Sequence, residues 1–142
     1  MNMMEMVLAM FAVVFFTTIA MVYNQAMWDQ AELLDNAGKY VQASHLAHSV
    51  LDEIDAKLFS KQLAFNNVKT SFNNSTRVMN LAHTGGTYNL AISAVDSDSL
   101  GVPLSTAVTN NIYVRVLVTV TTTGLAHPVT MKRIYTKTHL NI

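Results

Sequence analysis

The sequence predicts an α+β fold, in which a long N-terminal helix of about 55–60 residues packs against a small antiparallel sheet of three or more strands. Three observations lead to this prediction. An uncharged apolar stretch lies near the start of the chain, and an apolar periodicity of three and four residues follows it. Period-two alternation then marks the C-terminal half. Helical patterns therefore come first and strand patterns later.

The apolar stretch is long enough to cross a membrane. No charged residue lies between Glu5 and Asp29, and Met6–Val22 is apolar except for two threonines. A helix over residues 6–28 would be roughly 34 Å long at about 1.5 Å per residue, which exceeds the hydrocarbon thickness of a bilayer. We therefore predict a transmembrane-competent helix.

The flanks of this stretch differ from those of a secretory signal peptide. A signal peptide has a positively charged start and a shorter apolar region, whereas the first basic residue here is Lys39. Tyr23 and Trp28 lie at the C-terminal end of the stretch and favour the membrane–water boundary. We expect the segment to be part of the working protein, exposed by removal of a leader that is not in this sequence.

An amphipathic pattern continues the helix to about residue 61. No proline occurs in this part of the chain, and Gly38 is its one glycine. Apolar and small residues step by three and four along one stripe: Leu33, Ala37, Tyr40, Ser44, Ala47, Leu51, Ile54 and Leu58. The simplest interpretation is one helix of about 85–90 Å, which neighbouring elements must support.

Three segments of the C-terminal half are predicted to be strands. Residues 112–120 alternate strictly, with one apolar face made of Ile112, Val114, Val116, Val118 and Val120. Tyr88–Ala94 is a weaker strand, and Val129–Lys137 is rich in β-formers. The link at 123–128 contains glycine and proline and favours a hairpin between the last two strands. We expect the stripe on the helix to cover this sheet.

These patterns divide the chain into three parts. Residues 1–28 form the hydrophobic transmembrane or filament-core helix, and residues 29–61 form its amphipathic continuation. Residues 62–142 form a β-rich globular domain. Together they predict a lollipop-shaped subunit.

Composition excludes several classes of function. The formal net charge is zero and only 13% of residues are charged, so no basic surface is expected for nucleic acid. The chain has no cysteine, which excludes disulfides, iron–sulfur clusters and thiol catalysis. No catalytic motif or cofactor motif stands out. We expect neither an enzyme nor a cofactor-binding protein.

Glu5 has the most specific chemistry in the sequence. It lies one position before the apolar run, so a membrane or a filament core would largely desolvate it. An acidic residue at the centre of a membrane helix costs about 2.5–3.5 kcal/mol, and less near an end. Two interpretations remain open. Glu5 pairs with the α-amino group of a neighbouring processed subunit, or it lies in the lipid headgroup region.

The segment Met1–Val22 resembles the mature N-terminus of the type IV pilin superfamily. The shared features are a short uncharged lead, Glu5 at the fifth position, an unbroken apolar run, an amphipathic extension and a β-domain. The resemblance implies that prepilin peptidase exposes Met1, which is then N-methylated. It also implies that Glu5 neutralises the amino terminus of an adjacent subunit during assembly.

The resemblance implies a structural subunit of an extracellular, pilus-like filament, with a membrane-inserted precursor pool and a pilus assembly machinery. The core of this homopolymer would be built from Met6, Val7, Leu8, Met10, Phe11, Val14, Phe15, Phe16 and Ile19. Head-to-tail contacts of this kind give an open helical polymer. Two alternatives are a type II secretion pseudopilin and a monomeric, single-pass membrane-anchored accessory protein.

The sequence departs from the pilin pattern in two ways. Many bacterial pilins have a glycine and a proline in the apolar segment, which let it melt locally, but this chain has Val14 and Val22 and no helix breaker nearby. Thr17 and Thr18 can bond back to the helix backbone. We therefore predict a mostly continuous helix in the filament. The common C-terminal disulfide of the family is also absent.

Two weaker signals lie in the C-terminal part. Asp96 and Asp98 belong to an oxygen-rich segment that resembles a calcium loop but lacks the further ligands of an EF-hand, so an ordinary turn is the favoured interpretation. Asn73 and Asn74 begin two overlapping N-glycosylation sequons. A polar loop between helix and sheet is the favoured interpretation there.

Overall fold

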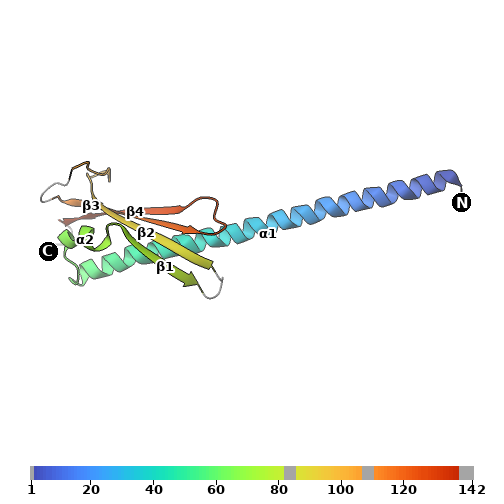
Figure 1. Cartoon of the computed structure of the whole chain (residues 1–142). Helices are drawn as coiled ribbons and strands as arrows, with labels where there is room; N and C mark the ends of the chain where they lie inside the picture. Colours follow the sequence, from blue (N-terminus) through green and yellow to red (C-terminus); the bar gives the residue numbers. More distant parts are fainter. Residues whose placement is uncertain (1, 82–85, 107–110, 138–142) are drawn as a thin grey trace. The chain divides into compact units, whose positions relative to one another are not determined.

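The computed structural model describes residues 2–81, 86–106 and 111–137. The elements are α1 (Met3–Phe59), the short 3₁₀ helix η1 (Phe65–Asn67), α2 (Val68–Phe72), β1 (Ser75–Leu81), β2 (Gly86–Asp96), β3 (Tyr113–Thr122) and β4 (Val129–Thr136). The chain divides into two compact units, Met1–Gly38 and Lys39–Ile142, which are described separately below. Figure 1 shows the course of the chain through these elements.

The predicted long helix is confirmed, because α1 runs for 57 residues without interruption. The hydroxyls of Thr17 and Thr18 donate to the carbonyls of Val13 and Val14 at 2.7 and 2.8 Å. These bonds satisfy the hydroxyls within an apolar surface without breaking the helix. The helix stops just before Lys61, whose φ of 58° lies in the left-handed region that ends many helices.

The sheet is a four-stranded antiparallel meander in the order β1-β2-β3-β4. The strict alternation predicted for residues 112–120 is present in β3, where Val114, Val116, Val118 and Val120 are all buried. Ile112 lies before the strand and is half-exposed. The predicted hairpin joins β3 to β4, and its turn contains Gly124 with a φ of 86°.

The sequence patterns missed the first strand and the short helices before it. β1 pairs with β2 along its full length, from Ser75 opposite Ile92 to Leu81 opposite Gly86. Its burial alternates between intermediate and exposed, because β1 is an edge strand of the sheet. Only Val78, Met79 and Leu81 in this strand are apolar, so the alternation of hydrophobicity is weak. Pairing with β2 therefore determines the strand conformation of this segment more than its intrinsic β-propensity does.

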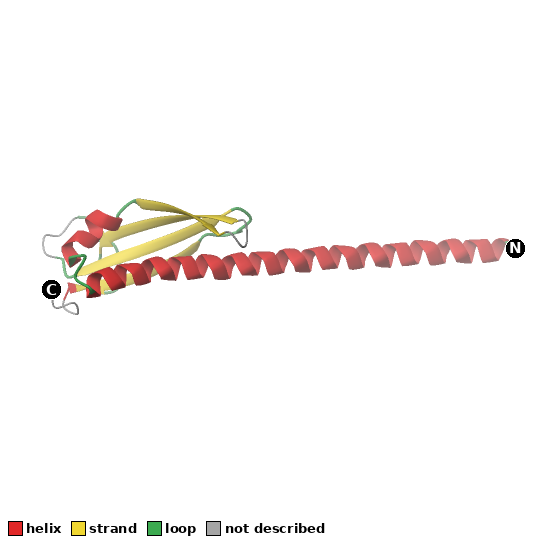
Figure 2. Cartoon of the chain, turned by 90° about the horizontal axis from the view of Figure 1, so that it is seen from below, coloured by secondary structure: helices red, strands yellow, loops and turns green. Residues whose placement is uncertain are grey.

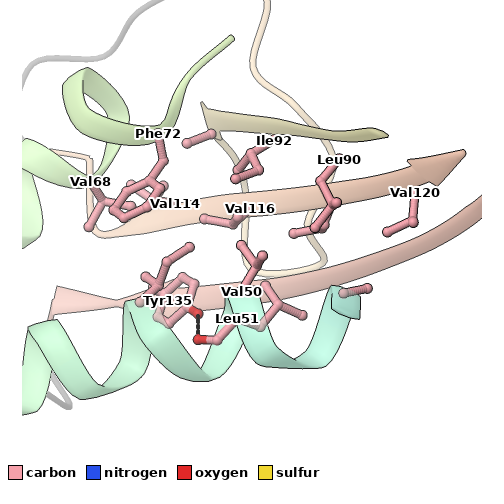
Figure 3. Close-up of a cluster of buried hydrophobic side chains, with 14 of the residues drawn as sticks. Val50, Leu51, Val68, Phe72, Leu90, Ile92, Val114, Val116, Val120 and Tyr135 are labelled. Atoms are coloured by element: carbon pink, nitrogen blue, oxygen red, sulfur yellow. Dashed lines mark hydrogen bonds between the residues drawn. The ribbon is translucent and has the colours of Figure 1, made fainter. Parts of the chain in front are cut away.

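The core of the Lys39–Ile142 unit lies between one face of the sheet and two helices. The C-terminal part of α1 runs along this face, as Figure 2 shows. The short helix α2 adds Val68 and Phe72 to the same core. Val50 and Leu51 of α1 meet the valines of β3, while Val68 and Phe72 of α2 close one end (Figure 3). The covering role predicted for the stripe is thus fulfilled by its C-terminal half. The buried residues of α1 are Ala43, Ala47, Val50, Leu51, Ile54 and Leu58.

Charged side chains join both edge strands to α1. From β1, Arg77 donates to the two carboxylate oxygens of Glu53 at 2.6 and 3.3 Å. Lys57, one turn further along α1, donates to the same carboxylate at 2.6 Å. The hydrogen bonds from Arg77 and then from Lys57 lower the pKa of Glu53 to about 2. Glu53 therefore stays ionised at pH values well below the usual pKa of a glutamate.

On the opposite edge of the sheet, Arg133 of β4 donates to Asp52 at 3.2 Å and also to Asp55. Burial opposes its charge, but these two carboxylates raise the pKa of Arg133. The hydroxyl of Tyr135 donates to the carbonyl of Leu51 at 3.2 Å, the dashed line in Figure 3. Burial and then Asp55 raise the pKa of Tyr135. Polar contacts therefore fix α1 at both edges of the sheet.

Candidate functional site

The apolar segment near the start of α1 is exposed on all sides. Every residue predicted to form a filament core is at least about half exposed: Met6, Val7, Leu8, Met10, Phe11, Val14, Phe15, Phe16 and Ile19. Phe11 is 73% exposed and Phe16 is 70% exposed. No residue of the Met1–Gly38 unit that the structure describes is buried. Within the described part of this unit, no apolar layer covers these side chains.

An apolar helix without polar sides requires an apolar environment. A helix that is hydrophobic all round is typical of a protein core or of a membrane span. Among the described residues, α1 is the one helix long and apolar enough to cross a bilayer. Each such side chain gains roughly 1.5–3 kcal/mol on leaving water. Lipid tails or the same helix of other copies can both provide this burial.

Two aromatic residues of the segment, Phe15 and Phe16, contact each other. The rings of Phe15 and Phe16 lie edge to face, with centroids 6.4 Å apart and an interplanar angle of 72°. Such a pair is worth about 0.5–1.5 kcal/mol beyond its buried area. Both rings remain exposed to the outside of the helix. The pair therefore presents a rigid apolar surface to whatever covers this segment.

Glu5 lies in the first turn of α1 and caps it. One of its carboxylate oxygens accepts a hydrogen bond from the backbone N–H of Asn2 at 3.1 Å. The carbonyl of Asn2 accepts from the backbone N–H groups of Glu5 and Met6 at 2.8 and 3.3 Å. The bond from the N–H of Asn2 to the Glu5 carboxylate is the glutamate half of a capping box, with Asn2 as N-cap and Glu5 at the third helical position. The bonds to the Asn2 carbonyl belong to the backbone of the first helical turn.

Glu5 thus has a local structural role besides its proposed role in assembly. Its negative charge lies at the positive end of the helix dipole, which stabilises it by about 0.3–1 kcal/mol at an exposed site. A carboxylate has about four lone-pair positions, so the bond from the neutral N–H of Asn2 leaves room for a further donor that carries a positive charge. Met1, the other predicted assembly residue, lies outside the described residues.

No protein-family model, curated protein or solved structure matches the chain. The long apolar helix and the four-stranded antiparallel sheet are compatible with a pilin-like fold at the level of architecture.

The calcium candidates Asp96 and Asp98 are engaged within the protein. Asp96 is buried at the end of β2 and pairs with Lys69 of α2 at 2.6 Å. One oxygen of Asp98 accepts from the backbone N–H groups of Leu100 and Val102 at 2.9 and 2.8 Å, which shapes the turn. Among the described residues, no group of three or more His, Cys, Asp or Glu side chains is placed to hold a metal ion.

The glycosylation candidates lie at the turn between α2 and β1. Asn73 follows the last residue of α2, and Asn74 has a φ of 54°. Both residues are exposed. Asparagine tolerates this left-handed conformation better than most residues, which gives the Asn-Asn pair a structural role in the turn.

Sequence reasoning missed three polar contacts of α1: the cap at Glu5 and the ion pairs of Arg77 and Arg133. The Asn2–Glu5 spacing is the sequence signature of a capping box, so this contact was recognisable from the sequence. The pairing of Glu53 with Arg77 and of Arg133 with Asp52 was not, because these partners lie 24 and 81 residues apart in the chain. Only the strand register brings them to the helix.

Proposed function

We propose that this chain is a structural subunit of a type IV pilus-like extracellular filament, in which α1 of many copies packs together. The observation that supports this most strongly is the exposed, uncharged apolar surface of residues 6–22 with a single carboxylate, Glu5, at its N-terminal end. The resemblance of Met1–Val22 to mature pilins agrees with the same role. The protein would have a structural and not a catalytic function.

The membrane would hold the subunit before assembly. Transfer from lipid to a bundle of apolar helices changes hydrophobic free energy little, because both environments are apolar. A specific polar contact is then needed to set the axial register of the subunits. In this proposal, Glu5 supplies it by binding the α-amino group of Met1 in a neighbouring copy, after a prepilin peptidase has exposed that group. The pilus assembly machinery would drive the transfer.

The test is electron microscopy of filaments sheared from the cell surface, with mass spectrometry of the N-terminus of this chain. We expect helical filaments that contain the chain with a methylated N-terminal residue. Recovery of the chain only as a detergent-soluble monomer would contradict the proposal and favour a membrane-anchored accessory protein. Short filaments confined to the periplasm would favour a pseudopilin.

Two substitutions of Glu5 separate its charge from its capping role. Glutamine keeps an oxygen for the capping contact but lacks the negative charge, whereas valine lacks both. We expect Glu5→Gln and Glu5→Val each to reduce filament number about tenfold or more, while the amount of chain in the membrane stays unchanged. Filaments of normal number in Glu5→Gln would show that the residue acts only as a cap.

A further inference from the structure

Charge is distributed very unevenly between the two units of the chain. All nine Lys and Arg residues lie in Lys39–Ile142, which holds five of the nine acidic residues and so has a formal charge of +4. Met1–Gly38 holds the other four acidic residues, Glu5, Asp29, Glu32 and Asp35, which gives it −4. Opposite net charges on two parts of one chain favour contacts between different copies.

Three of the four acidic residues lie together in the segment Trp28–Asp35, just after the apolar run. The same segment has exposed apolar side chains: Trp28 is 76% exposed, and Leu33 and Leu34 are exposed to a similar degree. It is therefore both acidic and apolar along about two turns of α1. A partner for it needs an apolar groove with cations nearby.

Such a groove lies in the Lys39–Ile142 unit, between the C-terminal end of α1 and β4. It has a volume of about 230 Å³ and is lined by Asp55, Leu58, Phe59, Arg133, Ile134, Tyr135 and Thr136. Leu58 and Tyr135 are buried residues, whereas Phe59 is 75% exposed. An apolar side chain that enters the groove would meet an existing apolar surface, with the ion pair of Arg133 and Asp55 at its side.

Two lysines give the neighbourhood of this groove a positive charge. Lys61 follows the lining residue Phe59 by two positions and is exposed. Lys137 directly follows the lining residue Thr136, and its backbone N–H bonds to the carbonyl of Ile112 at 2.9 Å. This bond holds the backbone of Lys137 at the C-terminal end of β4, next to the lining residues of the groove.

We propose that this groove binds the Trp28–Asp35 segment of a second copy of the chain. In the sequence, Trp28–Asp35 precedes the first lining residue of the groove, Asp55, by at least 20 residues. Trp28, Leu33 or Leu34 would enter the groove, and Asp29 and Glu32 would face Lys61 and Lys137. The contact is heterologous, and so it propagates from copy to copy. This inference rests on the proposed filament.

Charge reversal in the full-length chain tests the electrostatic part. We expect the double variant Lys61→Glu/Lys137→Glu and the double variant Asp29→Lys/Glu32→Lys each to reduce the number of sheared filaments about tenfold or more. The combination of all four substitutions should restore the number to within about threefold of wild type. Lys132→Glu is the control, because Lys132 is exposed on β4 and alternation directs it away from α1.

Cysteine cross-linking tests the geometry independently of assembly yield. Because the chain has no cysteine, Leu33→Cys with Phe59→Cys introduces the only two thiols. Oxidation of intact filaments should give a ladder of disulfide-linked multimers. The control pair, Leu33→Cys with Val78→Cys, combines the same helix position with an exposed site on β1 and should give no ladder.

The outcomes separate this inference from the proposed function. If wild-type cells carry no filament of this chain, the proposed function itself is wrong. If filaments form but the charge variants and wild type give equal numbers, and the 33–59 pair gives no ladder, only the groove contact is wrong. Rescue in the fourfold variant together with the 33–59 ladder would support it, whether or not an individual charge variant folds poorly.

Discussion

The two units of this chain differ in where their stability comes from. Lys39–Ile142 buries a core between α1, α2 and one face of the sheet, and it fixes α1 with ion pairs at both edges. Met1–Gly38 has no buried residue among those described and only one polar cap, at Glu5. The first kind of unit is stabilised by its own packing, whereas the second depends on its surroundings. The same helix thus contributes buried residues to a core in one unit and is exposed in the other.

The largest expected effect is on the core. Leu51 is 2% exposed and contacts the sheet, so Leu51→Ala should lower the free energy of unfolding by about 2–5 kcal/mol. Leu8→Ala, the same change in the exposed unit, should alter it by less than about 0.5 kcal/mol. Urea unfolding of the full chain in detergent measures both. Equal losses would show that the two units do not differ as described.

The next prediction concerns a substitution that affects the Met1–Gly38 unit and leaves the stability of Lys39–Ile142 unchanged. A lysine at Val14, within the uncharged run, should cost about 2.5–3.5 kcal/mol near the centre of a bilayer, although lysine is tolerated on an exposed helix in water. We expect Val14→Lys to lose most membrane retention and all filament assembly, with unchanged urea unfolding of Lys39–Ile142. Fractionation of cells and circular dichroism provide the two readouts. Normal membrane retention would contradict the assignment of this segment.

A smaller effect comes from the ion pair of Glu53. Because its pKa is lowered from 4.5 to about 2 in the folded chain, its contribution is fully present above pH 4.5 and is lost as the pH falls toward 2. The side chain is about a third exposed, so solvent screening limits this contribution to about 1 kcal/mol. Wild type should therefore lose more stability than Glu53→Gln between pH 5 and pH 2. Parallel curves for the two proteins would contradict the pairing.

The smallest effect concerns two glycines. Gly38 is within α1, and a Cβ there would meet no atom within 4 Å, so Gly38→Ala should stabilise the helix by about 0.5–1 kcal/mol. Gly124 has a φ of 86°, and a Cβ there would lie 2.8 Å from Nζ of Lys39. Gly124→Ala should therefore destabilise the β3–β4 hairpin. Thermal unfolding of both variants checks the opposite signs.

The sequence predicted the features that depend on local periodicity. The uninterrupted α1 follows from the three-and-four-residue stripe and the absence of proline, and β3 follows from its strict alternation of valine with other residues. The β3–β4 hairpin follows from its turn residues. In β3 and in the C-terminal half of the stripe, the residues that define the pattern are the ones buried, so local and tertiary preferences agree there.

Other features depend on contacts between distant parts of the chain. β1 is an edge strand with few apolar residues, and its pairing with β2 determines its structure. Leu33 belongs to the predicted stripe but is 68% exposed. Periodicity alone does not show which part of an apolar stripe is covered. At the candidate site, the exposure of the apolar run and the spacing of Asn2 and Glu5 were both readable from the sequence, whereas the groove beside β4 required the fold.

In the proposed filament, the apolar surface of residues 6–22 is buried among copies of the same helix. A helical reconstruction of sheared filaments by cryo-electron microscopy tests it most directly. We predict an axial bundle of continuous α1 helices in which Phe11 and Val14 contact neighbouring copies and Glu5 lies beside the amino terminus of one of them. A chain found only as single copies with this helix in lipid would contradict the account.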